Sequence, residues 1–192
     1  TSSGPYDELF YYIRHNIQDT KDDLALLVSG EHVPAAIGQF TSVSMEINSR
    51  EQIYSAMVVF GLLTYENGKV LIPNKELMDK FNELLLTKDS LGYVYQLARK
   101  SEQMLQATLS GDTKTMADIL QFAHNTESPI LSYNSETELS AIINLCYLSA
   151  RNKYWTSREE KSRKGFVDFI FFPKHKGEDG IIIELKVDST PE

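Results

Sequence analysis

The sequence predicts a mixed α+β fold, in which a helical region over residues 1–125 is followed by a helix and a β-sheet over residues 126–192. Two observations predict this class. Apolar residues recur at helical spacing along most of the first region, where a single pair of short apolar runs flanks Asn67-Gly68. In the second region, a helical pattern is followed by two strongly apolar runs of strand length, residues 166–172 and 181–187.

Composition limits the class of protein. A chain of 192 residues with 42% hydrophobic residues can bury a substantial core. No apolar run approaches the roughly 20 residues that cross a bilayer, and the first residues lack the pattern of a secretory signal. We therefore expect a cytoplasmic protein with no membrane partner. The net charge of -8 argues against a protein that coats nucleic acid by bulk charge.

The first elements in order are helices. Apolar residues from Tyr6 to Ile17 predict one helix, and Asp19 or Thr20 is expected to cap a second helix that ends at Gly30. After an irregular segment, Ser49 and Gln52 fit a capping box that begins a third helix.

A hairpin is expected over residues 62–72, because both residues of Asn67-Gly68 tolerate a positive φ. Pro73-Asn74 then begins another amphipathic helix. A helix, a hairpin and a helix in this order resemble a winged-helix module. Such modules contact DNA in some proteins and serve only for packing or oligomerisation in others, so the fold alone does not decide between these roles.

The next segments are also helical. Apolar spacing predicts one long helix from Ser90 to Leu109, closed by Gly111, and Asp112 is expected to cap the helix after it. The segment around Asn125 and Pro129 has the composition of a linker, which places a domain boundary near residue 125.

The second region begins with a predicted helix from Ser135 to Ala150, in which Ser135 and Glu138 fit a capping box. Cys146 falls on its apolar stripe, so we expect a buried structural thiol; a single cysteine also excludes disulfides within the chain and cysteine-based zinc sites. Tyr154 and Trp155 are expected to pack rather than to stack on bases.

Charged residues interrupt the two apolar strands at three positions, Asp168 in the first strand and Glu184 and Lys186 in the second. Side chains alternate along a strand, so Glu184 and Lys186 share a face, and Asp168 lies opposite them if the register allows. Two carboxylates with one ammonium suit metal-assisted phosphoryl hydrolysis, which needs hard oxygen ligands and a cation beside the water or the phosphate. A structural salt-bridge cluster, or a decayed active site, is the alternative.

These residues resemble the motif of the PD-(D/E)XK nuclease superfamily, through Val167-Asp168 and Glu184-Leu185-Lys186. More narrowly, the chain resembles the nuclease-like C-terminal region of AAA-ATPase-like proteins over roughly residues 20–188. That closer resemblance is carried by Gly61-Leu62-Leu63-Thr64, Ile72-Pro73-Asn74-Lys75-Glu76, the Glu138 helix, Gly165-Phe166-Val167-Asp168 and residues 181–187.

The resemblance implies a restriction-endonuclease-like core and a site for Mg²⁺ or Mn²⁺. Asp168 and Glu184 would bind the ion with the backbone carbonyl of Leu185, and Lys186 would orient or activate the water. Glu138 would be a further ligand, although a capping-box role explains this residue equally well.

A basic segment between Arg151 and Lys176 is the expected contact for nucleic acid, DNA in preference to RNA. The residues expected to hold the phosphate backbone are Arg158, Lys161, Arg163 and Lys164. The alternative for such a run of charge is a solvated face.

The chain also departs from the family. No G-x-x-x-x-G-K-[ST] loop occurs, so ATP hydrolysis is expected only from a separate or N-terminal ATPase domain. The family continues with another helix and strand beyond the position of Glu192, so we expect a core that is incomplete at its C-terminus, with an edge open to pairing in a homo-oligomer. Two hypotheses follow: a metal-dependent nuclease, or an inactive interaction or regulatory module of an ATPase.

Overall fold

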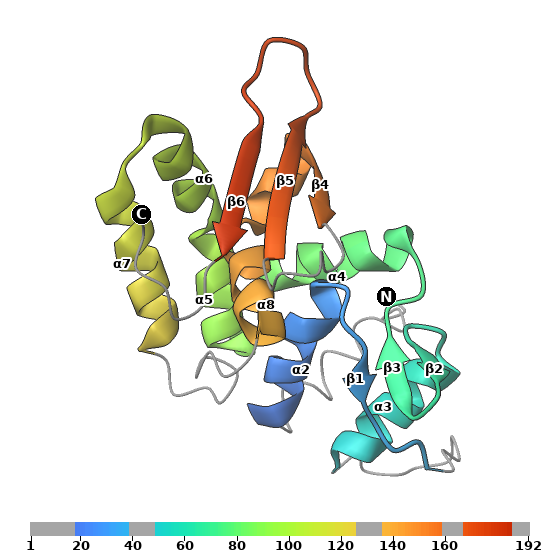
Figure 1. Cartoon of the computed structure of the whole chain (residues 1–192). Helices are drawn as coiled ribbons and strands as arrows, with labels where there is room; N and C mark the ends of the chain where they lie inside the picture. The colour runs from blue at the N-terminus through green and yellow to red at the C-terminus, as the bar shows by residue number, and fades with distance from the viewer. Residues whose placement is uncertain (1–17, 39–48, 126–135, 159–166, 186–192) are drawn as a thin grey trace, which may run out of the picture.

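The computed structural model describes residues 18–38, 49–125, 136–158 and 167–185 (Figure 1). Helices account for most of these residues, and they are accompanied by two antiparallel three-stranded sheets. The α+β class is therefore confirmed. The helix expected between Tyr6 and Ile17 lies outside these ranges. Among the helices inside them, none has the length and apolar character needed to span a membrane.

The first described helix, α2 (Gln18–Val28), begins before Asp19 and Thr20, so the expected cap at those residues is wrong. Thr20 instead lies inside the helix, where it is buried. The expected end is confirmed: Gly30 has a φ of 89°, and the Glu31 amide donates to the Leu26 carbonyl at 3.0 Å.

Helix α3 (Arg50–Val59) begins as the sequence predicts. The Gln52 amide donates to Ser49 Oγ at 3.2 Å, and the Ser49 amide donates to Gln52 Oε1 at 3.1 Å. Both halves of the capping box are present.

The expected hairpin consists of β2 (Thr64–Glu66) and β3 (Lys69–Leu71), joined at Asn67 and Gly68 with φ values of 50° and 78°. These two positive values are those that a tight two-residue turn requires. A third strand, β1 (Val33–Pro34), pairs with β3 and gives the sheet order β1-β3-β2. The sequence did not reveal β1, because two residues carry no alternation pattern and one of them is a proline.

Helix α4 (Lys75–Thr87) is capped by Asn74, whose side chain accepts from the Leu77 amide. The single helix expected from Ser90 to Leu109 is wrong. In its place are a 3₁₀ turn, η1 (Asp89–Leu91), and two helices, α5 (Tyr93–Arg99) and α6 (Ser101–Ser110).

Two local features break that helix. Gly92 has a φ of 62°, which right-handed helix does not allow. Further on, Ser101 Oγ donates to the Ala98 carbonyl at 2.5 Å, a side-chain bond that competes with the helical ladder. The predicted end at Gly111 and the predicted cap Asp112 of α7 (Thr113–His124) are both confirmed.

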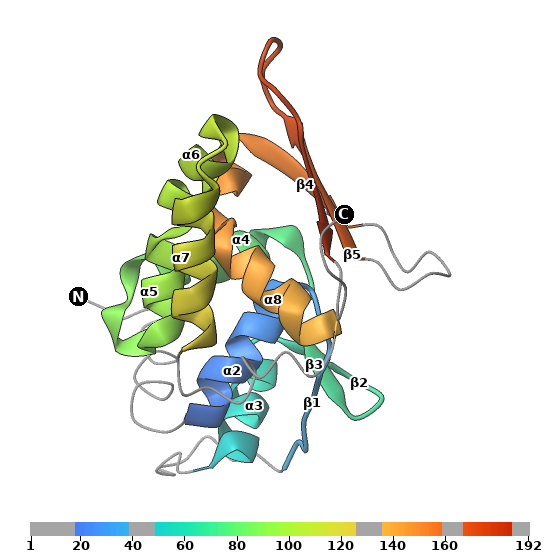
Figure 2. The same ribbon diagram turned by 60° about the vertical axis from the view of Figure 1, so that its left-hand side comes forward.

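Helix α8 (Glu136–Cys146) is followed by the 3₁₀ segment η3 (Leu148–Asn152), so the expected helix to Ala150 ends early. Every side chain from Ser140 to Ala150 is buried. Figure 2 shows the reason: α8 lies in the middle of the molecule, and it contacts α2, α5, α6 and α7.

The second sheet contains β4 (Tyr154–Arg158), β5 (Val167–Pro173) and β6 (Ile181–Leu185) in that order. Strands β5 and β6 confirm the predicted hairpin, whereas β4 was not anticipated because it alternates no apolar residues. Phe169 and Phe171 are buried on the face toward the helices, and the ring centroids of Phe171 and Tyr147 lie 5.3 Å apart.

One hydrophobic core includes residues from both sides of the expected boundary near residue 125, such as Leu97 and Ile142. The boundary itself stays a prediction, and the adjoining segment 126–135 is outside the described ranges.

A polar cluster ties the first elements together. Asp23 on α2 accepts from Arg50 Nε at 2.6 Å and from the Tyr54 hydroxyl at 2.5 Å, both on α3. Burial, reinforced by Asp23, raises the pKa of Tyr54. Arg50 Nη2 also donates to the Pro34 carbonyl in β1 at 2.8 Å. The Asp23 carboxylate therefore links α2 to α3 through two charge-assisted bonds, and Arg50 connects this pair to β1.

Replacing Asp23 by alanine should lower the free energy of unfolding by about 2 kcal/mol, because it leaves the buried Tyr54 hydroxyl without its acceptor and Arg50 without its carboxylate. Urea denaturation followed by circular dichroism measures the change. The control Asp118→Ala removes an exposed carboxylate from α7 and should change stability by less than about 0.5 kcal/mol. Equal effects of the two variants would contradict the assigned role.

Cys146 is fully buried, and burial raises the pKa of its thiol to about 12. Because only the thiolate reacts, we expect labelling by an aromatic disulfide at pH 8 to be at least about a hundredfold slower in the folded protein than in urea. The kinetics of thiol release measure this ratio, and rapid labelling without denaturant would show that the helix face is misassigned.

Candidate functional site

The β5–β6 hairpin sets the position of the expected catalytic carboxylates. Its antiparallel register pairs Asp168 directly with Glu184. Residues paired in this way project from the same face of a sheet, with Cβ atoms roughly 4.5–5.5 Å apart. The backbone therefore brings these two residues together. The side chain of Asp168 itself lies outside what the structure describes.

The face that carries this pair is the outer one. Phe169 is buried and its partner Ile183 is half-buried, so alternation turns Glu184 away from the helices. Glu184 is exposed, as is its neighbour Ile182, at 75%. The exposure of Glu184 disfavours the buried salt-bridge cluster that the sequence left open.

The structure describes the other expected site residues only in part. Leu185 is the last residue of β6 and is half-buried, and Lys186 falls beyond the described part. Glu138 lies in the first turn of α8 and is half-buried. Among the described side chains, which do not include Asp168, no group of three or more histidine, cysteine or acidic residues is arranged to hold a metal.

The expected nucleic-acid contacts lie largely outside the described ranges. Arg158 ends β4, where its backbone pairs with Phe169, but its side chain is not described. Lys161, Arg163 and Lys164 lie wholly outside the described residues. Their roles stay predictions.

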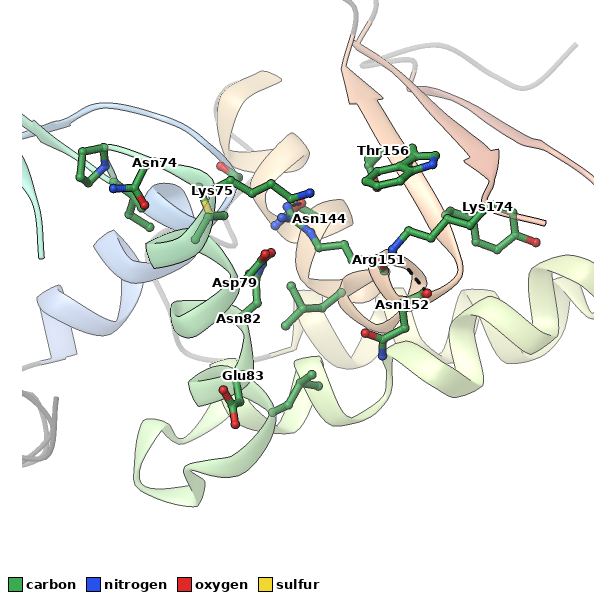
Figure 3. Close-up of a pocket in the computed structure, with 18 residues that line it drawn as sticks. Asn74, Lys75, Asp79, Asn82, Glu83, Asn144, Arg151, Asn152, Thr156 and Lys174 are labelled. Carbon is green, nitrogen blue, oxygen red and sulfur yellow. Dashed lines mark hydrogen bonds between the residues drawn. The ribbon is translucent and has the colours of Figure 1, made fainter. Parts of the chain in front are cut away.

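A second feature was not foreseen from the sequence. A pocket of about 800 Å³ opens where α4, η3 and the edge strand β4 meet (Figure 3). Its lining combines three cations with several amides and two acids: Lys75, Asp79, Asn82, Glu83, Asn144, Arg151, Asn152 and Lys174. Because α4 is some seventy residues before η3 in the chain, no sequence pattern could have brought these groups together.

Trp155 lies at this pocket with two ammonium groups over its ring. Lys75 Nζ is 4.9 Å and Lys174 Nζ is 4.7 Å from the ring centroid. The indole is nevertheless 56% exposed, so the expectation that Trp155 packs is wrong, while Tyr154 is buried as expected. Lys174 Nζ is held by the Arg151 carbonyl at 2.6 Å (Figure 3).

Arg151 brings a largely buried cation to the same pocket. Its Nη2 donates to Asn144 Oδ1 at 2.8 Å and to the Val28 carbonyl at 3.4 Å. Burial lowers the pKa of the guanidinium, an effect opposed by the nearby charge of Asp79. Within the described ranges no carboxylate lies within 4.0 Å of this guanidinium, so it faces the pocket without an ion-pair partner.

Asn82 is a buried polar residue of the pocket wall, 7% exposed. Neither its Nδ2 nor its Oδ1 finds a hydrogen-bond partner among the described residues. A buried amide in this state costs free energy that a bound molecule or a solvent molecule can recover.

No family model, curated protein or solved structure matches the chain. The resemblance carried by the hairpin motif therefore remains an interpretation of the sequence.

Replacing Asn82 by leucine should raise the free energy of unfolding by about 1 kcal/mol, because an apolar side chain of similar size removes two unpaired polar atoms from a buried position. Thermal and urea denaturation measure the change. Asn125→Leu, at an exposed helix end where the amide accepts from Gln121, is the control and should not stabilise the protein. A clear loss of stability in Asn82→Leu would show that the amide is paired in solution.

Proposed function

We propose that the chain is a metal-dependent nuclease that hydrolyses phosphodiester bonds of nucleic acid. The observation that carries this proposal is the strand register, which pairs Asp168 with Glu184 on one exposed face of the β5–β6 hairpin. Like charges directly opposite one another are unfavourable, and a bound divalent cation would offset this repulsion.

The donor set fits a hard divalent cation. Carboxylate oxygens from Asp168 and Glu184, joined by the main-chain carbonyl of Leu185, are ligands of the kind that Mg²⁺ and Mn²⁺ prefer. When bound, the ion would lower the pKa of a water and polarise the phosphate.

Lys186 follows Glu184 by two residues, which in an extended strand directs it to the same side. Its ammonium would orient the water and balance the charge of the phosphate. The water would give up a proton to solvent and form the new bond to phosphorus as the bond to the leaving sugar oxygen breaks, and that oxygen would take up a proton from solvent. Glu138 would add a carboxylate from α8.

The substrate would be DNA in preference to RNA, held along its backbone by Arg158, Lys161, Arg163 and Lys164. The exposure of Glu184 leaves this face open to a large substrate. The proposal places the protein in the cytoplasm, acting with an ATPase domain or as a homo-oligomer.

A second candidate is a catalytically inactive, nuclease-like interaction or regulatory module of an AAA-ATPase-like protein. Exposed apolar side chains favour it, because Trp155 and Phe172 are paired neighbours on the outer face of the sheet and are 56% and 50% exposed. Ile182 extends this apolar surface on β6. Exposed apolar patches of this kind often mark sites of association.

The two candidates are separated by Asp168→Asn. If the protein is a nuclease, its rate of Mg²⁺- or Mn²⁺-dependent cleavage of labelled DNA should fall more than about a hundredfold, because the variant lacks a ligand of the ion. Its folded state should keep or gain stability, since a repulsion between neighbouring carboxylates has been removed.

Asp179→Asn is the matched control, because Asp179 is an exposed acid in the loop of the same hairpin. It should leave cleavage unchanged. Thermal melts add an independent measurement: Mn²⁺ should stabilise the wild type and the control but not Asp168→Asn. If the wild type shows neither cleavage nor stabilisation by Mn²⁺, the inactive module is the correct function.

A further inference from the structure

We propose that the pocket between α4, η3 and β4 binds a nucleotide, either free or as one unit of a nucleic-acid strand. In this arrangement the phosphate lies among the ammonium and guanidinium groups, and the base lies against Trp155. The inference does not depend on the hairpin being catalytic, because it uses none of the expected catalytic residues.

The size and shape of the pocket suit such a ligand. Its volume of about 800 Å³ is within the range of roughly 300–1,000 Å³ found for small-molecule sites. Its wall combines the apolar groups Ile72, Met78 and Leu148 with polar side chains. This mixture is typical of sites that bind a molecule with a planar apolar part and a charged part.

The charged side chains at the pocket favour an anionic ligand. Three cations, Lys75, Arg151 and Lys174, face two acids, Asp79 and Glu83, at the pocket, although the whole chain carries a net charge of -8. No carboxylate within the described ranges lies within 4.0 Å of the Arg151 guanidinium, and the charge of Asp79 acts on it only from a greater distance. Because the guanidinium is largely buried, a closer anion would stabilise it. A phosphate offers several acceptor oxygens and a negative charge to these donors, whereas a cationic or neutral ligand would leave their excess positive charge unbalanced.

The exposed indole of Trp155 favours a ligand that contains a planar group. Trp155 keeps 56% of its surface exposed at the mouth of the pocket, where the two lysines fix its position through their contacts with the ring. Exposed aromatic rings beside cations are the usual platform for nucleobases, because each base presents a flat face. An inorganic anion would satisfy the cations but leave the indole in water.

Asn82 belongs to the pocket wall, but both of its unpaired amide atoms are buried, so the base is not placed against them. A nucleotide thus accounts for the cations and the indole together.

Trp155 is the only tryptophan, so its fluorescence reports on this pocket directly. We expect nucleoside monophosphates to change the emission saturably, with dissociation constants between about 10 μM and 1 mM. Inorganic phosphate should compete, but more weakly than any nucleotide.

Lys75→Gln should weaken binding about tenfold, as expected for the loss of one charge-assisted hydrogen bond. Lys114→Gln is its matched control, because Lys114 also lies in the first turn of a helix and is exposed, but far from the pocket lining. Calorimetric titration of both variants, with thermal melts to verify folding, provides a second readout that does not rely on the indole.

The affinities of a nucleoside monophosphate and of a short single-stranded oligonucleotide show whether the pocket binds a free nucleotide or one unit of a strand. If the oligonucleotide binds at least about tenfold tighter, with a steeper dependence on salt, the ligand is a unit of a strand; equal affinities identify a free nucleotide. Either result supports the pocket.

The inference is overturned if no nucleotide changes the fluorescence or releases heat at concentrations up to about 5 mM, or if Lys75→Gln and Lys114→Gln bind alike. Asp168→Asn should bind nucleotides as the wild type does. Failure of the nuclease proposal and failure of this one are therefore distinguishable, because cleavage and binding are lost in different variants.

Discussion

The burial of the segment from Ser140 to Ala150, which includes most of α8 and the start of η3, is the constraint on which the rest of the structure depends. From Ser140 to Ala150 no side chain reaches solvent to a significant extent, so this segment must be enclosed by other elements to be stable. Helices α2, α5, α6 and α7 supply most of that enclosure, and the sheet β4–β6 follows directly from the end of the segment through η3. The sheet that carries the carboxylate pair and one wall of the pocket are therefore connected directly to this buried segment.

The two sites use that support differently. The pocket lies where η3 leaves α8 and β4 begins, so Arg151 and Trp155 are fixed within a few residues of the buried helix, and α4 closes the other side with Lys75. The carboxylate pair lies at the other end of the hairpin, where only the strand register positions it. The pocket is thus built by packing between distant segments, and the pair by main-chain hydrogen bonds.

This difference also explains what the sequence could predict. The caps at Ser49, Asn74 and Asp112, the turn at Asn67-Gly68 and the β5–β6 hairpin all rest on local chemistry, and each is found. The break between α5 and α6 was missed because a lysine and a serine interrupt the helix without a glycine or proline at that point. The pocket was missed because its residues come from segments that are distant in the sequence and share no periodic pattern. The exposure of Trp155 was missed because it depends on how α4 packs in the tertiary structure. Alternation along the strands could be predicted for Asp168 and Glu184, but their direct pairing depends on the register, which the sequence left open and the structure supplies.

The turn at Asn67-Gly68 also sets how this protein ages. The same absence of a side chain at Gly68 that permits its φ of 78° leaves its amide nitrogen open to attack the carboxamide of Asn67. This attack would release ammonia and form a cyclic imide, which water would open to aspartate or isoaspartate. Isoaspartate adds a methylene to the backbone of a two-residue turn, so the pairing of Thr64 with Leu71 would lose its register. Because β3 is the central strand, β1 would lose its partner as well. Chemical ageing at one asparagine would therefore loosen the whole small sheet, and it would do so while the buried helix and both candidate sites remained intact.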